Sequence, residues 1–95
     1  SRQGDEIAAI HGGWRGLFNG IIENTLSNMK TSPLDILVWI GPAICQHCYP
    51  TGQEVYTAFT GKYPITQQAF KKTESQYFAD LPKIAEIIFN VNGVD

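Results

Sequence analysis

The chain has 95 residues, 43% of them hydrophobic, and a formal net charge of -2. This length allows at most one domain with a modest core, and the hydrophobic content excludes a disordered chain. Lysines and arginines do not gather in a strip, and no apolar run approaches the roughly 20 residues that cross a membrane. We therefore expect no nucleic-acid partner and no membrane partner. The polar residues 1–6 do not resemble a signal peptide, which predicts a cytoplasmic protein.

The first half of the chain has the pattern of a strand, a helix and a second strand. Residues 6–10 are short and apolar, as a buried strand is, and apolar residues at helical spacing predict a helix over residues 16–29. The sequence Thr31-Ser32-Pro33 ends that helix, and the continuous apolar residues 35–40 predict a second strand covered on both faces. Together they predict a right-handed βαβ unit in a mostly parallel or mixed α/β sheet with flanking helices.

Two further helices are predicted in the second half. Thr51 and Glu54 have the spacing of a capping box, which starts a helix that buries Val55, Ala58 and Phe59 and ends near Gly61. Residues 67–72 are compatible with a short helix. Asp80 is the expected N-cap of a final helix with Pro82 in its first turn. The side chains that this last helix should bury are Leu81, Ile84, Ala85, Ile88 and Phe89.

The most informative motif, His11-Gly12-Gly13-Trp14-Arg15-Gly16, lies where the first strand should lead into the first helix. A histidine at a strand end is held rigidly while its ring stays accessible, so metal or acid–base chemistry is possible there. Glycines allow a sharp turn and a close approach of the backbone to a ligand, and an arginine binds phosphate or carboxylate. The alternative is structural: a hydrogen-bonded histidine, an ordinary turn, a solvated arginine and Trp14 as a packing residue.

Both predicted strands end on the same side of a parallel sheet. Open parallel sheets bind ligands in the crevice beyond the carboxyl ends of their strands. The motif should therefore face the loop of residues 43–50, which follows Gly41-Pro42. The expected lining of this cleft is His11, Arg15, Cys45, His47 and Cys48.

The two cysteines lie in Cys45-Gln46-His47-Cys48. Nothing else in the chain points to a secreted protein, so free thiols are the default, although a disulfide is an alternative. A single C-x-x-C is a weak signal for zinc, and His47 and Cys48, as neighbours, cannot easily face one ion. Cys48 is either a buried small side chain or a nucleophile with His11 or His47 as its base.

Several blocks of the sequence resemble the YfiH-like family, which is also called the multicopper polyphenol oxidoreductase or laccase-domain family. The blocks are Ala8 to Leu17, similar to A-A-x-H-A-G-W-R-G-L; Trp39 to Ile44, which contains G-P-x-I; and Cys48 to Val55, similar to C-Y-E-V-G-x-E-V. Tyr77 to Leu81 and Asn92-Gly93-Val94 match the closing segments. The blocks occur in the family order over nearly the whole chain. The sequence departs from the pattern at Gly12, which replaces alanine, and at Pro50-Thr51, which replace Glu-Val. Cys45 and His47 also occupy positions where the family more often has glycine and a variable residue.

The resemblance implies an α/β domain longer than this chain, of which residues 1–95 are the C-terminal portion of a single domain. The chain enters a strand almost at once and ends at a turn, so we expect the segments before residue 1 and the strands after residue 95 to be missing. The family holds one zinc through a His-Cys-His set, and His11 matches its last histidine. The other two ligands lie upstream in the family, so Cys45 and Cys48 are not the metal cysteine. Copper is the alternative metal.

The activity that the resemblance implies is purine nucleoside phosphorolysis, acting on adenosine, inosine or methylthioadenosine, together with adenosine deamination. The expected partners are a small nucleoside and phosphate. We assign a metal-ligand role to His11, phosphate binding to Gly12, Gly13 and Arg15, and base stacking to Tyr49. The alternatives are a cysteine hydrolase with Cys48 as nucleophile, a peptidoglycan-editing enzyme and a copper-dependent polyphenol oxidase. An isolated 95-residue piece is expected to be inactive.

Overall fold

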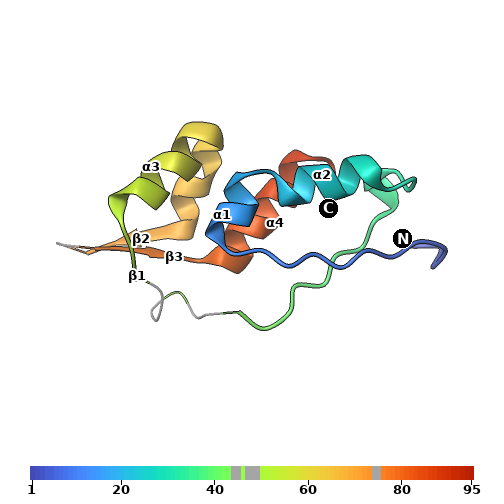
Figure 1. Cartoon of the computed structure of the whole chain (residues 1–95), viewed down its shortest axis with the longest axis horizontal. Helices are drawn as coiled ribbons and strands as arrows, with labels where there is room; N and C mark the ends of the chain where they lie inside the picture. The colour runs from blue at the N-terminus through green and yellow to red at the C-terminus, as the bar shows by residue number, and fades with distance from the viewer. Residues whose placement is uncertain (44–45, 47–49, 74–75) are drawn as a thin grey trace.

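A computed structural model of the chain describes residues 1–43, 46, 50–73 and 76–95. Figure 1 shows the arrangement of its elements. Their order is α1 (Trp14–Phe18), α2 (Ile21–Asn28), the 3-10 helix η1 (Pro33–Asp35), β1 (Pro50–Thr51), α3 (Gln53–Lys62), the 3-10 helix η3 (Pro64–Ala69), β2 (Phe70–Lys72), β3 (Tyr77–Ala79) and α4 (Leu81–Val91). The combination of helices and sheet agrees with the predicted α/β class with flanking helices.

The sheet of the described residues is small and antiparallel, with the strand order β1-β3-β2. Its central strand β3 pairs with β1 through Thr51 and Tyr77, and with β2 through Lys71 and Phe78. β3 runs directly into α4, as Figure 1 shows, so the sheet and the helical layer are joined without a long loop. The sequence analysis did not predict a strand at residues 77–79.

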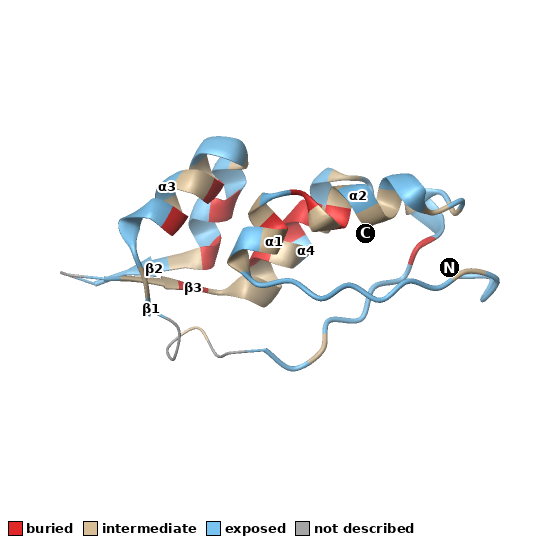
Figure 2. Cartoon of the chain, viewed as in Figure 1, coloured by how far each residue is buried: buried red, intermediate tan, exposed pale blue. Residues whose placement is uncertain are grey.

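The core lies between the helices, where the buried residues of Figure 2 gather. Ile84 and Ile88 of α4 have no exposed surface, and neither does Phe59 of α3, while Ile22 of α2 is 1% exposed. The ring of Phe18 meets Phe59 edge-on with 5.9 Å between centroids, which is a favoured aromatic geometry. The predicted burial of Ile84 and Ile88 is therefore confirmed. Leu81, Ala85 and Phe89 pack at the edge of this core, and the buried Ile87 was not predicted.

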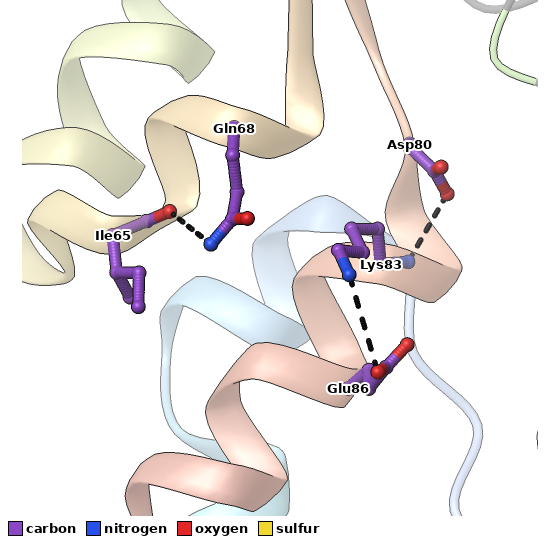
Figure 3. A network of polar contacts seen from close by, with 5 residues as sticks. All are labelled: Ile65, Gln68, Asp80, Lys83 and Glu86. Atoms are coloured by element: carbon purple, nitrogen blue, oxygen red, sulfur yellow. Dashed lines mark hydrogen bonds and ion pairs between the residues drawn. The ribbon is translucent and has the colours of Figure 1, made fainter.

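Helix α4 begins as the sequence predicts. The Asp80 carboxylate accepts a hydrogen bond of 3.0 Å from the backbone N–H of Lys83, as Figure 3 shows, so Asp80 is the N-cap. The Lys83 ammonium lies 4.0 Å from a Glu86 carboxylate oxygen at the surface, where such a pair contributes little stability. The nearby Gln68 amide donates to the Ile65 carbonyl and stays within η3. The cap, not the ion pair, therefore determines where α4 starts.

The other helix predictions need correction. The single helix expected over residues 16–29 is two helices, because Gly20 adopts a left-handed conformation with φ of 95° between α1 and α2. The capping box is not formed, because the N-cap of α3 is Gly52. Thr51 belongs to β1 instead, and its hydroxyl donates to the Tyr77 carbonyl. The short helix expected over residues 67–72 is instead η3, which ends at Ala69. Residues 70–72 form β2 and pair with β3, so they cannot continue the helix.

The two strands predicted at residues 6–10 and 35–40 are also not formed in this structure. Both segments lack regular secondary structure beyond η1, and no parallel strand pair occurs in the described residues. Their apolar side chains face solvent, with Ile7 90% exposed, Leu37 64% and Trp39 84%, whereas Ile36 is buried. A strand requires a hydrogen-bonding neighbour and cover for its apolar faces. Neither segment has them here, and the molecule is elongated, measuring 48 × 25 × 19 Å.

The N-terminal segment is nevertheless attached to the helical layer through Glu6. One Glu6 carboxylate oxygen accepts the backbone N–H of Lys30 at 3.0 Å, and the other accepts the N–H and the hydroxyl of Thr31 at 2.8 and 2.6 Å. The Lys30 N–H, followed by the Thr31 hydroxyl and N–H, lowers the pKa of Glu6 from 4.5 to about 2. This carboxylate therefore links the segment before the motif to the end of α2. No described helix has the length and apolar character needed to cross a bilayer.

We predict that this link fails in acid. Because the folded-state pKa of Glu6 is depressed, its contribution to stability is complete above about pH 4.5 and is lost as the pH falls towards 2. Glu6→Gln should therefore lower the free energy of unfolding at pH 7, and its difference from the wild type should shrink between pH 4.5 and 3. Urea unfolding of the complete protein across this range measures the effect. Glu54→Gln, at an exposed carboxylate of α3, is the control, and an equal pH dependence in both variants would contradict the link.

Candidate active site at the start of α1

The histidine–glycine motif forms an open approach to a short helix. His11, Gly12 and Gly13 are exposed, and Gly13 is the N-cap of α1 with an extended backbone, φ -85° and ψ -165°. The Gly13 carbonyl accepts the N–H of Leu17 at 3.1 Å, and the buried Leu17 side chain anchors α1 in the core. The chain folds this way because the polar and glycine-rich residues stay outside while Leu17 enters the core. The imidazole of His11 is thereby left accessible.

The structure does not support a sharp turn as the reason for the motif's glycines. The described glycines with positive φ are Gly4, Gly20 and Gly93, so Gly12, Gly13 and Gly16 occupy backbone conformations that other residues adopt. A Cβ on Gly13 would meet nothing within 4 Å, and one on Gly12 would lie 3.4 Å from Ile21. The described backbone therefore does not require glycine at these positions through a positive φ, and the predicted sharp turn stays a prediction. Their second expected role, close approach of a ligand to the backbone, stays a prediction.

Arg15 is positioned for recognition of an anion. Its side chain is exposed, and its guanidinium carbon lies 5.2 Å from the centroid of the Trp14 ring. Such a contact restrains the guanidinium and contributes about 0.5–1 kcal/mol at an exposed site. Among the described residues, no carboxylate lies within ion-pair distance of Arg15. Trp14 itself packs against the core, as predicted, so Arg15 extends from a fixed aromatic support with its charge uncompensated by those residues.

The imidazole of His11 is exposed and is an available nitrogen donor. Across residues 1–43, 46, 50–73 and 76–95, no three histidine, cysteine, aspartate or glutamate side chains come together as metal ligands. A catalytic zinc needs three protein ligands. The role of His11 as one of them, which the family resemblance implies, therefore stays a prediction.

The second expected wall of the cleft cannot be placed. Cys45, His47, Cys48 and Tyr49 lie outside the described residues, so their predicted positions and roles stay predictions. Gln46 lies between them, and its amide donates to the carbonyls of Ala69 and Phe78 at 3.3 Å each. This contact joins the loop to the end of η3 and to β3. The pairing of Pro50 with Phe78 joins the end of the same loop to β3.

Two surface clefts of the described residues are lined by residues other than His11 and Arg15. One, of about 320 Å³, lies between α3, η3 and the β2–β3 pair, where Tyr56 and Tyr77 stack with centroids 4.4 Å apart. The other, of about 440 Å³, is lined by Glu6 and the residues that follow α2. The cleft predicted between the motif and the loop of residues 43–50 therefore stays a prediction.

Sequence reasoning missed one contact on α1. The Lys62 ammonium at the end of α3 donates to the Phe18 carbonyl at 2.6 Å. The two residues are 44 positions apart, and an exposed lysine after a helical pattern carries no signal of a distant acceptor. The contact exists because tertiary packing brings the end of α3 next to the end of α1.

Comparison with known proteins supports the sequence resemblance. The family described as multi-copper polyphenol oxidoreductase laccase matches residues 1–95. The chain is 40% identical over 85 residues to purine nucleoside phosphorylase YfiH of Shigella flexneri, covering 90% of this chain and 35% of that protein. It is 35% identical over 95 residues to purine nucleoside phosphorylase PA4543 of Pseudomonas aeruginosa, covering 98% of this chain and 39% of that protein.

A solved structure has the same fold. Protein NMB0706 of Neisseria meningitidis superposes with a TM-score of 0.85 at 36% identity, covering 88% of this chain and 35% of that chain. The present chain thus spans between about a third and two fifths of the length of these relatives. The match extends over the whole sequence, and the predicted fold class and family are confirmed. The chain belongs to the YfiH-like family, also described as the multi-copper polyphenol oxidoreductase laccase family.

Proposed function

We propose that the complete protein is a zinc-dependent purine nucleoside enzyme that cleaves adenosine, inosine or methylthioadenosine with phosphate and also deaminates adenosine. The observation that carries this proposal is the pairing of an accessible His11 with an exposed, uncompensated Arg15 four positions away, in a chain whose relatives are named purine nucleoside phosphorylases. Because those relatives are longer than this chain, the activity is proposed for the complete protein and not for these 95 residues. We place the enzyme in the cytoplasm.

Phosphorolysis requires a phosphate oxygen to bond to the ribose C1′ while the bond from C1′ to the purine nitrogen breaks. The base leaves with the electron pair and takes up a proton. The main task of the protein is to hold a multiply charged phosphate next to an uncharged sugar. A guanidinium does this through paired hydrogen bonds, and Arg15, which rests on Trp14, is the group of this chain suited to it. Gly12 and Gly13 leave the neighbouring backbone open to the same ligand.

His11 would hold the zinc together with ligands that this chain does not contain. A zinc ion bound there would act as a Lewis acid and lower the pKa of a coordinated water, which is the chemistry that deamination requires. The contribution of this chain is to present one imidazole nitrogen at the end of an extended segment. Tyr49 is the candidate to stack on the base, and packing within its loop is the alternative.

A second candidate is copper-dependent phenol oxidation, which the description of the matching family names. The relatives that the comparisons name are purine nucleoside phosphorylases, and these names favour nucleoside chemistry over phenol oxidation. A cysteine hydrolase using Cys48 would lose its activity on alkylation with zinc still bound.

The deciding experiment combines metal analysis with turnover of inosine and adenosine by the complete protein, with and without phosphate. Release of free base that depends on phosphate supports phosphorolysis, and conversion of adenosine to inosine without phosphate supports deamination. Phenol oxidation by a copper-loaded protein, with neither nucleoside reaction, would overturn the proposal.

We predict that His11→Ala in the complete protein loses its zinc, because one of three protein ligands is removed. Metal analysis of the purified variant measures this, with unfolding curves to show that the fold is intact. Unchanged zinc stoichiometry would exclude His11 as a ligand.

We predict that Arg15→Ala raises the KM for phosphate roughly 10- to 100-fold, because charge-assisted hydrogen bonds are lost, and leaves the zinc content unchanged. The KM of Arg15→Lys for phosphate should fall between those of the wild type and Arg15→Ala, since a lysine keeps the charge but not the paired donors. Arg2→Ala is the matched control because it removes the other arginine of the chain. Equal losses of zinc and phosphate affinity in Arg15→Ala would contradict the assigned role.

We predict that Gly13→Ala leaves the free energy of unfolding within about 1 kcal/mol of the wild type. The reduced freedom of the unfolded chain favours alanine, and the N-cap position favours glycine, so the two effects oppose each other. Gly20→Ala, at φ of 95°, should instead destabilise by about 1–2 kcal/mol. Urea unfolding compares the two variants. Equal destabilisation of both variants would contradict the conclusion that Gly13, unlike Gly20, has a backbone conformation open to other residues. If the backbone at Gly13 contacts the ligand, Gly13→Ala also raises the KM for phosphate.

A further inference from the structure

Lys62 makes a set of contacts at the end of α1 that is separate from the site residues. It is the last residue of α3, and its ammonium donates to the Phe18 carbonyl at 2.6 Å. The same nitrogen lies 5.2 Å from the centroid of the Phe18 ring and 5.4 Å from that of Tyr63. One cation therefore joins the C-terminal end of α3 to the C-terminal end of α1.

The carbonyl that Lys62 binds is one that α1 cannot satisfy itself. The last four carbonyls of a helix have no partner within the helix, and the partial negative charge there favours a cation. The backbone of α1 turns away at Gly20, so α2 does not extend the same hydrogen-bond ladder. Lys62 thus supplies to the Phe18 carbonyl both a hydrogen bond and a charge of the stabilising sign.

Helix α1 needs such support because it has five residues. Helices this short are unstable in water without tertiary contacts. The contacts that hold α1 to the core include the packing of Trp14, the buried Leu17, the edge-on packing of Phe18 on Phe59 and the Lys62 hydrogen bond. The apolar side chains fix one side of the helix, and the Lys62 hydrogen bond fixes its last turn.

We propose that Lys62 is a positioning residue for the candidate site. It holds the last turn of α1 against α3, and the rigid helix transmits this placement to Arg15 and to the approach that carries His11. Lys62 does not contact the substrate in this proposal. The expected effect of Lys62 on phosphate binding rests on the proposed function, whereas its effect on the stability of α1 does not.

The experiment measures hydrogen exchange of backbone amides in the complete protein. The probes are the N–H groups of Leu17 and Asn19, which bond within α1 to Gly13 and Arg15, and those of Ile84 and Ile88 in α4 serve as the internal reference. Lys62→Met keeps the aliphatic stem and removes the charge and the donors. We expect exchange in α1 to become roughly 5- to 10-fold faster with α4 unchanged, since a charge-assisted hydrogen bond is lost.

Three further variants make this result specific. Lys62→Arg keeps a cation and donors and should restore slow exchange in α1. Lys62→Gln keeps a donor without the charge, so its exchange rate in α1 should fall between those of Lys62→Met and Lys62→Arg. This variant replaces Lys62→Met in the experiment if Lys62→Met folds poorly. Lys71→Met, at an exposed lysine of β2, is the matched control and should change nothing. Unchanged α1 exchange in Lys62→Met, or faster exchange in α4 to the same degree, would overturn the proposal.

Kinetics separate this inference from the proposed function. If both hold, Lys62→Met raises the KM for phosphate several-fold with zinc content unchanged, and Lys62→Arg restores the KM. Faster α1 exchange with an unchanged KM would support Lys62 as a stabiliser of α1 and overturn its positioning role for the site, while the role of Arg15 is tested separately by Arg15→Ala. A changed KM with unchanged α1 exchange would overturn the positioning role.

Discussion

The apolar face of α4 is the contact on which the other elements depend. Ile84 and Ile88 are fully buried, and α2 and η3 pack on this helix from different parts of the chain. β3 leads straight into α4 through the cap at Asp80, so the position of the sheet follows from that of the helix. Because the sheet strands have two or three residues each, they cannot hold the fold by themselves. Burial on α4 therefore organises both layers.

The extended segments at residues 6–10 and 36–40 show how far a local pattern determines structure. Their runs of apolar residues favour strands, yet Ile7 and Trp39 are mostly exposed and no ladder forms. Strand formation depends on a neighbouring strand and on cover for both faces, neither of which is a property of the segment itself. The N-terminal segment is held instead by Glu6, whose carboxylate accepts three hydrogen bonds from Lys30 and Thr31. These hydrogen bonds, and not strand pairing, thus hold the N-terminal segment against the end of α2.

The candidate site depends on the same division between local and distant contacts. The motif from His11 to Arg15 could be recognised from its residues, and the structure leaves His11 and Arg15 exposed at the start of α1. The left-handed glycine near the motif is Gly20, which separates α1 from α2 and was not predicted. The support of α1 by Lys62 comes from a residue 44 positions away. Residue type predicts the chemistry of the site, and packing determines which groups hold α1 in place.

The sequence alone determined the family, the α/β class, the N-cap at Asp80 and the buried face of α4. Each of these depends on residue identity or on periodicity within a few turns, so local information suffices. The tertiary structure decided the break at Gly20, the failure of the capping box at Thr51, the antiparallel sheet and the contacts of Glu6 and Lys62. These depend on which acceptors, strands and apolar surfaces lie next to a residue in space. That proximity arises only when distant segments pack together, and no local pattern encodes it.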